Sequence, residues 1–227
     1  MLGSRLAHEV CCLPKVTLGG QTAALNHGLR AARAPLIARI DAADVPLPER
    51  LSRQASFQAS HPDVGLLGSG RARDRAVRRV VRTLTAPCDD RALRRELMRA
   101  NPFIHSSVMF RRAVVDAVGA YDESFAVAED YDLWLRMSHV TRLANLGEPL
   151  VLRRLAPGRL SSARDTTRLR DEVVAKLRAL RSDASPPWSA VFVAKPLGAL
   201  MLPPPLKRAA RAVLARAARS AVNCPKF

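Results

Sequence analysis

A short apolar run that ends in clustered aspartates is the feature that most limits how this chain can fold. Leu36–Ile40 reads LIARI and is followed directly by Asp41 and Asp44, and then by Pro46 and Pro48. Such a run, stopped by acidic and proline residues, is typical of a buried strand that leaves its sheet through a polar turn. Because open α/β sheets bind ligands at the carboxyl ends of their strands, this turn is an expected place for a ligand site.

Segments with helical spacing of apolar residues alternate with further apolar runs of strand length. This alternation predicts an α/β domain with a mostly parallel sheet flanked by helices on both faces. Trp134 and Met137 are predicted to be core residues. The predicted helices cover residues 21–32, 48–61, 89–101, 111–118 and 131–138, and the further strands cover residues 64–70, 105–110 and 148–155. The arginine-rich segment Arg71–Arg82 contains valines that hint at an edge strand.

The chain changes character after residue 160. Helices are predicted at residues 166–181 and 206–220, with a proline-rich link between them. We therefore predict a domain over residues 1–160 and a helical, basic C-terminal extension over residues 161–227. Leu206–Ser220 carries five bases and no acid, with its apolar residues on one side, which is typical of a basic amphipathic helix. Two interpretations stay open: the helix lies on an anionic membrane surface, or it packs on the domain.

The charge balance points to an anionic partner, since the formal net charge is +17. A hydrophobic content of 48% and a charged content of 25% are those of a soluble globular protein, which argues against disorder and against a transmembrane bundle. The basic segments would suit a nucleic-acid phosphate backbone. An aromatic content of only 4% and the lack of a nucleic-acid-binding motif disfavour that partner.

The cysteines indicate a reducing compartment. They are spaced neither for a metal site nor for a disulfide framework. We therefore expect a cytoplasmic protein, associated with the inner face of the cell membrane if the basic helix binds lipid. The four residues are Cys11, Cys12, Cys88 and Cys224.

Five sequence blocks carry a resemblance to a known family. They are ALNHG at residues 24–28, ARIDAADVPLPERLSRQ at 38–54, NPFIHSSVMFRR at 101–112, VGAYDESF at 118–125 and AEDYDLWLR at 128–136. In this order they resemble the family 2 glycosyltransferases, over about residues 19–155. The resemblance implies a GT-A fold and an enzyme that transfers a sugar from a nucleotide-diphosphate sugar to an acceptor hydroxyl with inversion. Such enzymes assemble polysaccharides, glycans or glycolipids.

The resemblance also implies roles for individual residues. Asp130, with Glu129 beside it, corresponds to the acid pair that takes the proton from the acceptor hydroxyl. Asp41 and Asp44 correspond to the carboxylates that hold Mg²⁺ or Mn²⁺ at the departing diphosphate. The implied partners are a nucleotide-sugar donor and a glycan or lipid-linked acceptor. The residues predicted to contact substrate are Asn26, Arg39, Arg50, His105 and Arg136.

Two of these assignments have a helix-based alternative. Asp130 also stands at the start of the predicted helix 131–138, where an aspartate can serve as an N-cap. Arg136 is four residues after Asp132, a spacing that suits an ion pair on the helix surface.

The other predicted substrate-binding residues also have alternatives. Arg39 and Arg50 either hold the diphosphate or neutralise nearby carboxylates. His105 either faces the donor or is packed in the interior. Asn26 either contacts the donor or is exposed on its helix.

Two departures from the family pattern change the expected activity. Ala43 stands where the family commonly has a metal-binding carboxylate, which weakens the expectation of a metal. Only about twenty residues precede the ALNHG block, where the family has two strand-helix units that form the nucleotide pocket. We therefore expect an N-terminally shortened glycosyltransferase with weak donor binding. The alternatives are a catalytically impaired fragment and a basic module that binds nucleic acid or a membrane surface.

Overall fold

The computed structural model describes residues 20–42, 44–74, 80–84, 87–154, 165–181 and 191–201. Ala43, the N-terminal residues 1–19 and the predicted helix Leu206–Ser220 lie outside these ranges. In chain order the elements are α1 (Gly20–Ala31), β1 (Leu36–Ala38), β2 (Asp44–Pro46), α2 (Arg50–Ser60), β3 (Val64–Asp74), β4 (Val80–Leu84), α3 (Asp90–Arg99), a 3₁₀ turn η1 (His105–Ser107), β5 (Met109–Arg111), α4 (Arg112–Val118), α5 (Glu129–Met137), β6 (Arg142–Arg154), α7 (Asp165–Arg181) and α8 (Val191–Met201).

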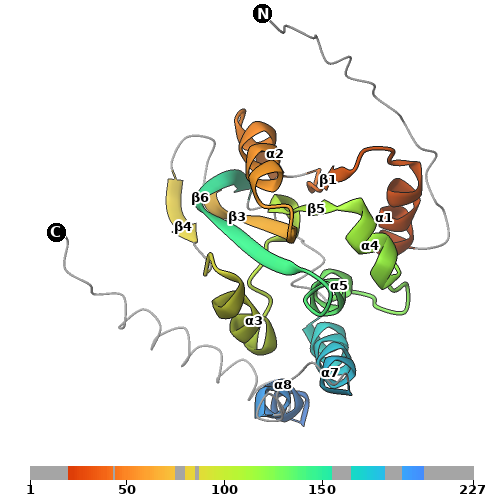
Figure 1. Cartoon of the computed structure of the whole chain (residues 1–227). Coiled ribbons are helices and arrows are strands. Elements are labelled where there is room, and N and C mark those ends of the chain that lie inside the picture. Colours follow the sequence, from red (N-terminus) through yellow and green to blue (C-terminus); the bar gives the residue numbers. More distant parts are fainter. Residues whose placement is uncertain are drawn as a thin grey trace, which may run out of the picture.

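The described strands form one mixed sheet in the order β1-β5-β3-β6-β2, with β4 paired to β3 (Figure 1). Only β3 and β6 pair in parallel among them, so the prediction of a mostly parallel sheet is wrong. The helix-linked strands β1, β3 and β6 do share one direction. β5 lies between β1 and β3 and runs the opposite way, and an apolar pattern does not record strand direction.

Both faces of the sheet are covered by helices, as predicted. Leu66 and Leu67 are neighbours on β3 and are both fully buried, although a strand points them to opposite faces. Leu66 packs in the main core with Trp134 and Met137 of α5, which confirms these two as core residues. Leu67 belongs to a smaller cluster against Phe57 of α2. In Figure 1, α2 accordingly lies on one side of the sheet and α3 and α5 on the other.

Helix ends follow the local sequence closely. The carboxylate of Asp89 accepts a hydrogen bond of 2.9 Å from the backbone N–H of Ala92, as expected of an N-cap at the start of α3. Gly119 closes α4 with a φ of +87°, a conformation that favours glycine. α5 begins at Glu129, and its N-cap position is Ala128, so Asp130 is not the N-cap residue.

Three short elements differ from the prediction. Asp44–Pro46 forms an edge strand, β2, where a turn is predicted, and proline is tolerated at a sheet edge. His105–Ser107 is a 3₁₀ turn instead of the start of a strand. α8 occupies the predicted proline-rich link. The hint of an edge strand in the arginine-rich segment is confirmed by β4.

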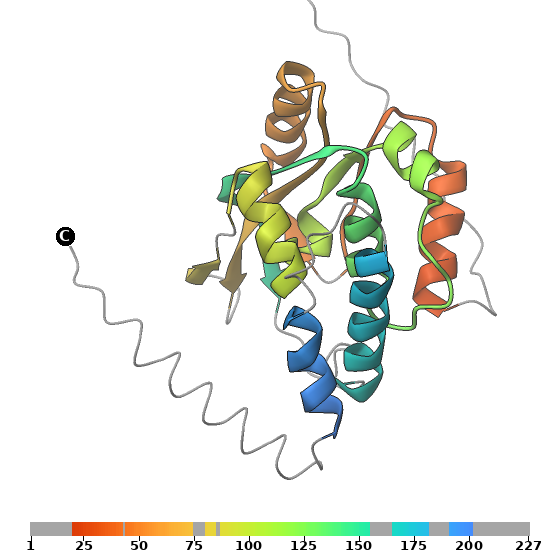
Figure 2. The same ribbon diagram turned by 60° about the horizontal axis from the view of Figure 1, so that its bottom comes forward.

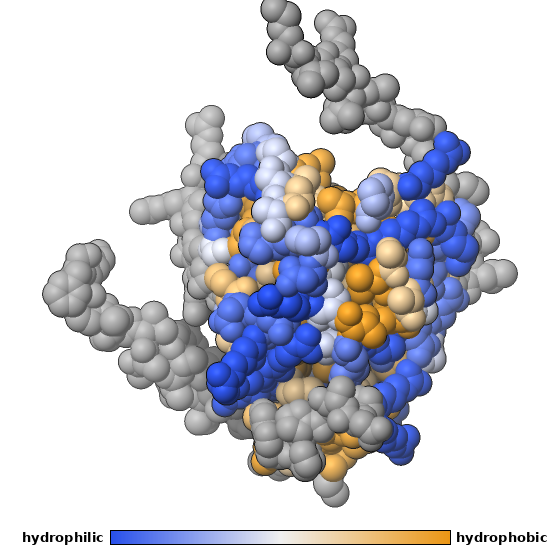
Figure 3. All heavy atoms as spheres, in the orientation of Figure 1, coloured by the Kyte–Doolittle hydropathy of each residue, from blue (hydrophilic) through white to orange (hydrophobic). Residues whose placement is uncertain are grey.

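α7 is packed into the main core. Ala175 and Ala179 of this helix belong to the same cluster as Trp134, and Figure 2 shows α7 alongside α5, followed by α8. The predicted domain boundary near residue 160 falls outside the described residues and stays a prediction. The described helices are too short or too polar to cross a membrane. The face seen in Figure 3 is mostly hydrophilic, with apolar atoms in small separate patches.

Candidate active site

Asp41 lies just after β1 and is held by two neighbours. Its Oδ1 is 2.6 Å from Nη2 of Arg39, and its Oδ2 accepts a hydrogen bond of 2.7 Å from Ser106 Oγ. Partial burial raises the pKa of Asp41, but hydrogen bonds from Arg39 and Ser106 and the positive charge of Arg39 outweigh that effect. The pKa of Asp41 therefore lies below its ordinary value. The side chain remains 41% exposed.

The pairing of β1 with β5 brings these residues together. Ala38 is paired with Met109, and the N–H of Arg39 donates to the carbonyl of Val108 over 3.1 Å. Ser106 lies in the turn η1, immediately before β5, and its hydroxyl also accepts the backbone N–H of Asp41. Two segments more than sixty residues apart in sequence thus form one end of the site.

Glu129 and Asp130 occupy the first turn of α5. Glu129 is only 4% exposed and accepts a hydrogen bond of 3.0 Å from Gln21 Nε2 on α1. Asp130 is half-buried, and its Oδ2 accepts a hydrogen bond of 3.0 Å from Asn101 Nδ2. The backbone N–H of Tyr131 donates to its Oδ1.

The pKa values of this acid pair lie near neutrality. Burial, with the negative charge of Asp130 as a second cause, raises the pKa of Glu129 to about 7. Burial raises the pKa of Asp130 to about 6, although hydrogen bonds from the Tyr131 backbone and Asn101 and the charge of Arg39 oppose the rise. Carboxyl groups with such values exchange protons readily near neutral pH.

Arg39 connects the two groups of carboxylates. Its positive charge lowers the pKa of both Glu129 and Asp130, and the negative charge of Asp41 raises the pKa of Glu129. Because such interactions weaken with distance and with screening by solvent, these side chains lie in one region of the molecule. The structure therefore brings together the predicted acid pair, Arg39 and the predicted metal ligand Asp41.

His105 lies in the same region as an uncharged group. Its Nε2 is 2.8 Å from the hydroxyl oxygen of Tyr121, and its ring meets Trp134 edge-to-face at 5.9 Å. Burial, followed by the charge of Arg39, lowers the pKa of His105 to about 3. Burial raises the pKa of Tyr121, so both groups stay neutral near pH 7.

Arg50 is a buried structural residue, since only 2% of it is exposed. Its Nε donates to Gln54 Oε1 over 3.0 Å, and its Nη2 donates to the carbonyls of Arg39 and Val108 over 2.7 and 3.1 Å. Burial and the charge of Arg39 lower its pKa to about 10. Arg50 thus supports the backbone beneath the site, and a contact with the donor stays a prediction.

Asn26 is buried, so the alternative of an exposed side chain is wrong. Its Nδ2 donates to the carbonyl of Tyr121 over 2.8 Å, and its Oδ1 accepts the N–H of Tyr121 over 3.1 Å. These bonds attach α1 to the segment that leads to the acid pair. The contact predicted between Asn26 and the donor remains a prediction.

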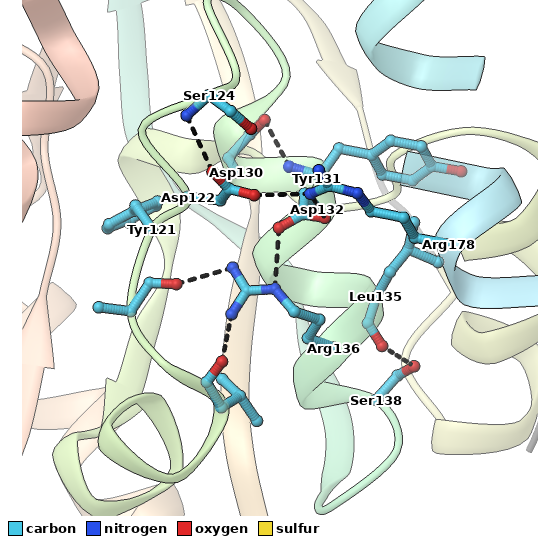
Figure 4. A network of polar contacts seen from close by, with 12 residues as sticks. Tyr121, Asp122, Ser124, Asp130, Tyr131, Asp132, Leu135, Arg136, Ser138 and Arg178 are labelled. Atoms are coloured by element: carbon cyan, nitrogen blue, oxygen red, sulfur yellow. Dashed lines mark hydrogen bonds and ion pairs between the residues drawn. The ribbon is translucent and has the colours of Figure 1, made fainter. Parts of the chain in front are cut away.

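Arg136 bonds α5 and the end of α4. It pairs with Asp132 at 2.8 Å, which confirms the predicted ion pair, and donates to the carbonyls of Val118 and Ala120 (Figure 4). It lines a surface cavity of about 580 Å³ between the end of α4, α5 and α7, which neither Asp41 nor Asp130 lines. Its predicted substrate contact remains a prediction.

Several residues of the site are not recognisable from the sequence as such. Ser106 holds Asp41, Asn101 holds Asp130, Gln21 holds Glu129 and Tyr121 holds His105. Ser106 and Asn101 both lie in the NPFIHSS block, and Tyr121 lies in the VGAYDESF block. For these three residues the available signal was their presence within blocks that already stood out, and Gln21 lies outside all five blocks.

The carboxylates fit a divalent cation only in part. Among the described residues, no group of three or more His, Cys, Asp or Glu side chains is arranged to hold a metal. Asp44 is 7% exposed within β2, and its N–H donates to the carbonyl of Asp41 over 3.0 Å. Asp41 is half-exposed and keeps lone pairs beyond its bonds to Arg39 and Ser106. It fits as a single protein ligand for a cation that substrate phosphates also hold.

Comparison with known proteins identifies the family. The profile of glycosyl transferase family 2 matches residues 6–119, about half of the chain. This chain belongs to glycosyl transferase family 2.

Two curated relatives act in bacterial polysaccharide assembly, by their names. The amylovoran biosynthesis glycosyltransferase AmsE of Erwinia amylovora is 34% identical over 152 residues, which cover 66% of this chain and 56% of AmsE. The O-antigen biosynthesis glycosyltransferase WbnJ of Escherichia coli is 31% identical over 120 residues, which cover 53% of this chain and 46% of WbnJ. The chain thus spans about half the length of these relatives.

A solved structure shows the fold. S. aureus TarS residues 1–349, in complex with UDP-GlcNAc, superimposes with a TM-score of 0.59 and 19% sequence identity. The match covers 79% of this family 2 chain and 52% of the TarS chain. It confirms the predicted GT-A-like fold.

Proposed function

We propose that this family 2 chain transfers a sugar from a nucleotide-diphosphate sugar to an acceptor hydroxyl with inversion, in the assembly of a polysaccharide, glycan or glycolipid. The observation that carries the proposal is the acid pair Glu129 and Asp130 in the first turn of α5, which Gln21 and Asn101 hold in the region that also contains Arg39 and Asp41. Burial raises the pKa of both acids toward neutrality. The family and the names of the relatives AmsE and WbnJ support the same reaction.

Asp130 is the base in this proposal. With a pKa of about 6 it is ionised at neutral pH and still basic enough to accept the proton that the acceptor hydroxyl loses as it attacks. Its negative charge raises the pKa of Glu129, so Glu129 keeps its proton more readily while Asp130 works. A single displacement from the side opposite the leaving diphosphate gives inversion.

Arg39 and Asp41 form the donor end. The Nε of Arg39 is buried and has no hydrogen-bond partner among the described residues, so this guanidinium has a donor left for a diphosphate oxygen. Asp41, with Asp44 as the further predicted ligand, would hold a Mg²⁺ or Mn²⁺ ion. When bound, such an ion supplies Lewis-acid stabilisation of the charge that develops on the diphosphate.

The acceptor and the location of the chain belong to the same proposal. A glycan or lipid-linked acceptor agrees with the names of the relatives. Attachment to the inner face of the cell membrane through Leu206–Ser220, and a cytoplasmic location, remain predictions from the sequence.

Release of nucleotide from sugar donors tests this function. The full chain is incubated with UDP-, GDP- and dTDP-sugars and Mn²⁺, and is compared with the variant Asp130→Asn. We expect turnover with at least one donor and a loss of about 10²- to 10⁴-fold in Asp130→Asn, the usual contribution of a general base.

The control is Asp116→Asn, which changes an exposed carboxylate on α4 and should keep wild-type turnover. Absence of turnover with every donor, together with donor dissociation constants above the millimolar range, would instead support the catalytically impaired alternative.

A further inference from the structure

The segment Tyr121–Ala128, here called the acidic loop, leads directly into the acid pair at the start of α5. It runs between α1 and α7, as Figure 2 shows, and both helices hold it through side chains. A loop of this kind has few backbone bonds of its own, so its N–H and C=O groups need partners from neighbouring elements.

α1 holds the acidic loop from one side. Thr22 Oγ1 donates to the carbonyl of Phe125 over 3.1 Å, and Asn26 bonds both backbone groups of Tyr121. Thr22 and Asn26 are both buried. These contacts fix the first half of the loop.

α7 holds the loop from the other side. Asp171 Oδ2 accepts the consecutive backbone N–H groups of Ala126 and Val127, each over 3.0 Å. Arg178 Nη1 is 2.6 Å from Asp122 Oδ2, and its guanidinium lies 5.0 Å from the centre of the Phe125 ring. Figure 4 shows Arg178 reaching from α7 to the acidic residues beside α5.

The hydrogen bonds of Asp171 reach Val127, two residues before Glu129. Because one side chain bonds two consecutive backbone N–H groups, Asp171 restrains the backbone that enters α5. A base must lie within hydrogen-bond reach of the proton that it abstracts, and small displacements reduce the rate strongly. The position of the acid pair therefore depends on α7, a helix about forty residues further along the chain.

We infer that Asp171 and Arg178 are positioning residues, which act through the acidic loop to hold Glu129 and Asp130 for proton transfer. The inference rests on the proposed function. It also makes α7 part of the catalytic unit.

Amide hydrogen exchange in the full chain tests whether Asp171 and Arg178 hold the acidic loop. In Asp171→Ala we expect exchange at the amides of Ala126 and Val127 to accelerate at least tenfold, since both lose their acceptor. Arg178→Met should accelerate exchange across the loop by a smaller factor. The control Arg170→Met removes an exposed arginine from the same helix and should leave exchange at the wild-type rate. Wild-type exchange in Asp171→Ala would overturn the inference.

Turnover tests the positioning. α7 makes no described contact with Arg39 or Asp41, so Asp171→Ala and Arg178→Met should lower kcat about tenfold and change the donor KM less than twofold. Arg178→Lys keeps the charge beside Asp122 and should recover part of kcat. Faster exchange with an unchanged kcat would mean that the loop is held but does not position the acids, which also overturns the inference.

A readout without turnover separates this inference from the proposed function. The ¹³C carboxyl signals of Glu129 and Asp130 should shift in Asp171→Ala and stay in place in Arg170→Met. If the wild-type chain transfers no sugar, the proposed function fails while these shifts still support the positioning of the acid pair. Unchanged carboxyl signals would overturn the positioning whatever the activity.

Discussion

The two carboxylate regions of the site differ in a way that composition does not reveal. At the end of β1, Asp41 is half-exposed beside a cation, and its pKa lies below the ordinary value. At the start of α5, Glu129 is buried and Asp130 is half-buried beside it, and their pKa values rise to about 7 and about 6. The same functional group is thereby divided between two tasks: a permanent anion that suits cation binding, and an acid pair that suits proton transfer.

Replacement of Arg39 should have the largest effect, because it changes the surroundings of both carboxylate regions. In Arg39→Met, Asp41 loses its ion pair and the acid pair loses the charge that lowers its pKa. We expect turnover to fall about 10²-fold, the usual effect of removing one electrostatic stabiliser. The pKa of Asp130 should rise when this charge is removed, so the pH of half-maximal turnover should also move upward from about 6.

A pH–rate profile of the full chain measures both effects. Arg39→Lys keeps a positive charge and should return the half-maximal pH toward the wild-type value. An unaltered profile in Arg39→Met would show that the two carboxylate regions are not coupled.

Replacement of Glu129 by glutamine tests the same contrast through the free energy of unfolding. Burial raises the pKa of Glu129 from 4.5 to about 7, so the folded chain binds more protons than the unfolded chain between these values. Its contribution to stability therefore falls as the pH rises through this window. We expect Glu129→Gln to be more stable than wild type by about 2–3 kcal/mol at pH 8 and by almost nothing at pH 4.

Urea unfolding of both proteins at pH 4 and pH 8 gives the two free-energy differences. Glutamine keeps an acceptor for the hydrogen bond from Gln21, which limits other changes. An advantage of equal size at both pH values would argue against the cost of a buried charge.

Removal of the Ser106 hydroxyl should have the smallest effect. Ser106→Ala deletes the hydroxyl that donates to the Asp41 carboxylate over 2.7 Å and accepts longer bonds from the Asp41 N–H and Arg39. The short bond to the carboxylate is worth about 1 kcal/mol, or a decrease of about 2–4 °C in Tm. Because that bond lowers the pKa of Asp41, the stability difference between wild type and variant should be full above the ordinary aspartate pKa and should shrink as the pH falls through it. Thermal melts from pH 7 to pH 3 test both, with the exposed Ser52→Ala as control.

The helices were predictable where local residues decide them. Asp89 caps α3 and Gly119 ends α4 through interactions within a few residues, and the sequence records these directly. The direction of β5 and the existence of β2 depend on pairing with distant strands. α8 was not predicted because its sequence contains a proline, which disfavours a helix locally. The helix forms because tertiary packing outweighs that local preference.

The site was predictable only as far as the family blocks extend. The resemblance proposed Asp41 and the acid pair as site residues, but it did not show that Ser106 and Asn101 hold them across 65 and 29 residues of sequence. The sequence also did not show that Arg50 bonds the backbone beneath the site, and its predicted contact with substrate stays a prediction. A guanidinium can bind either a substrate phosphate or backbone carbonyls, so the presence of an arginine does not say which of the two it does.

The edge-to-face contact between His105 and Trp134 gives the molecule an optical reporter. Trp134 is one of two tryptophans in the sequence, is fully buried and touches a ring that belongs to the site. Any ligand that moves or protonates that imidazole will alter the indole emission, so occupancy can be followed by intrinsic fluorescence without a label.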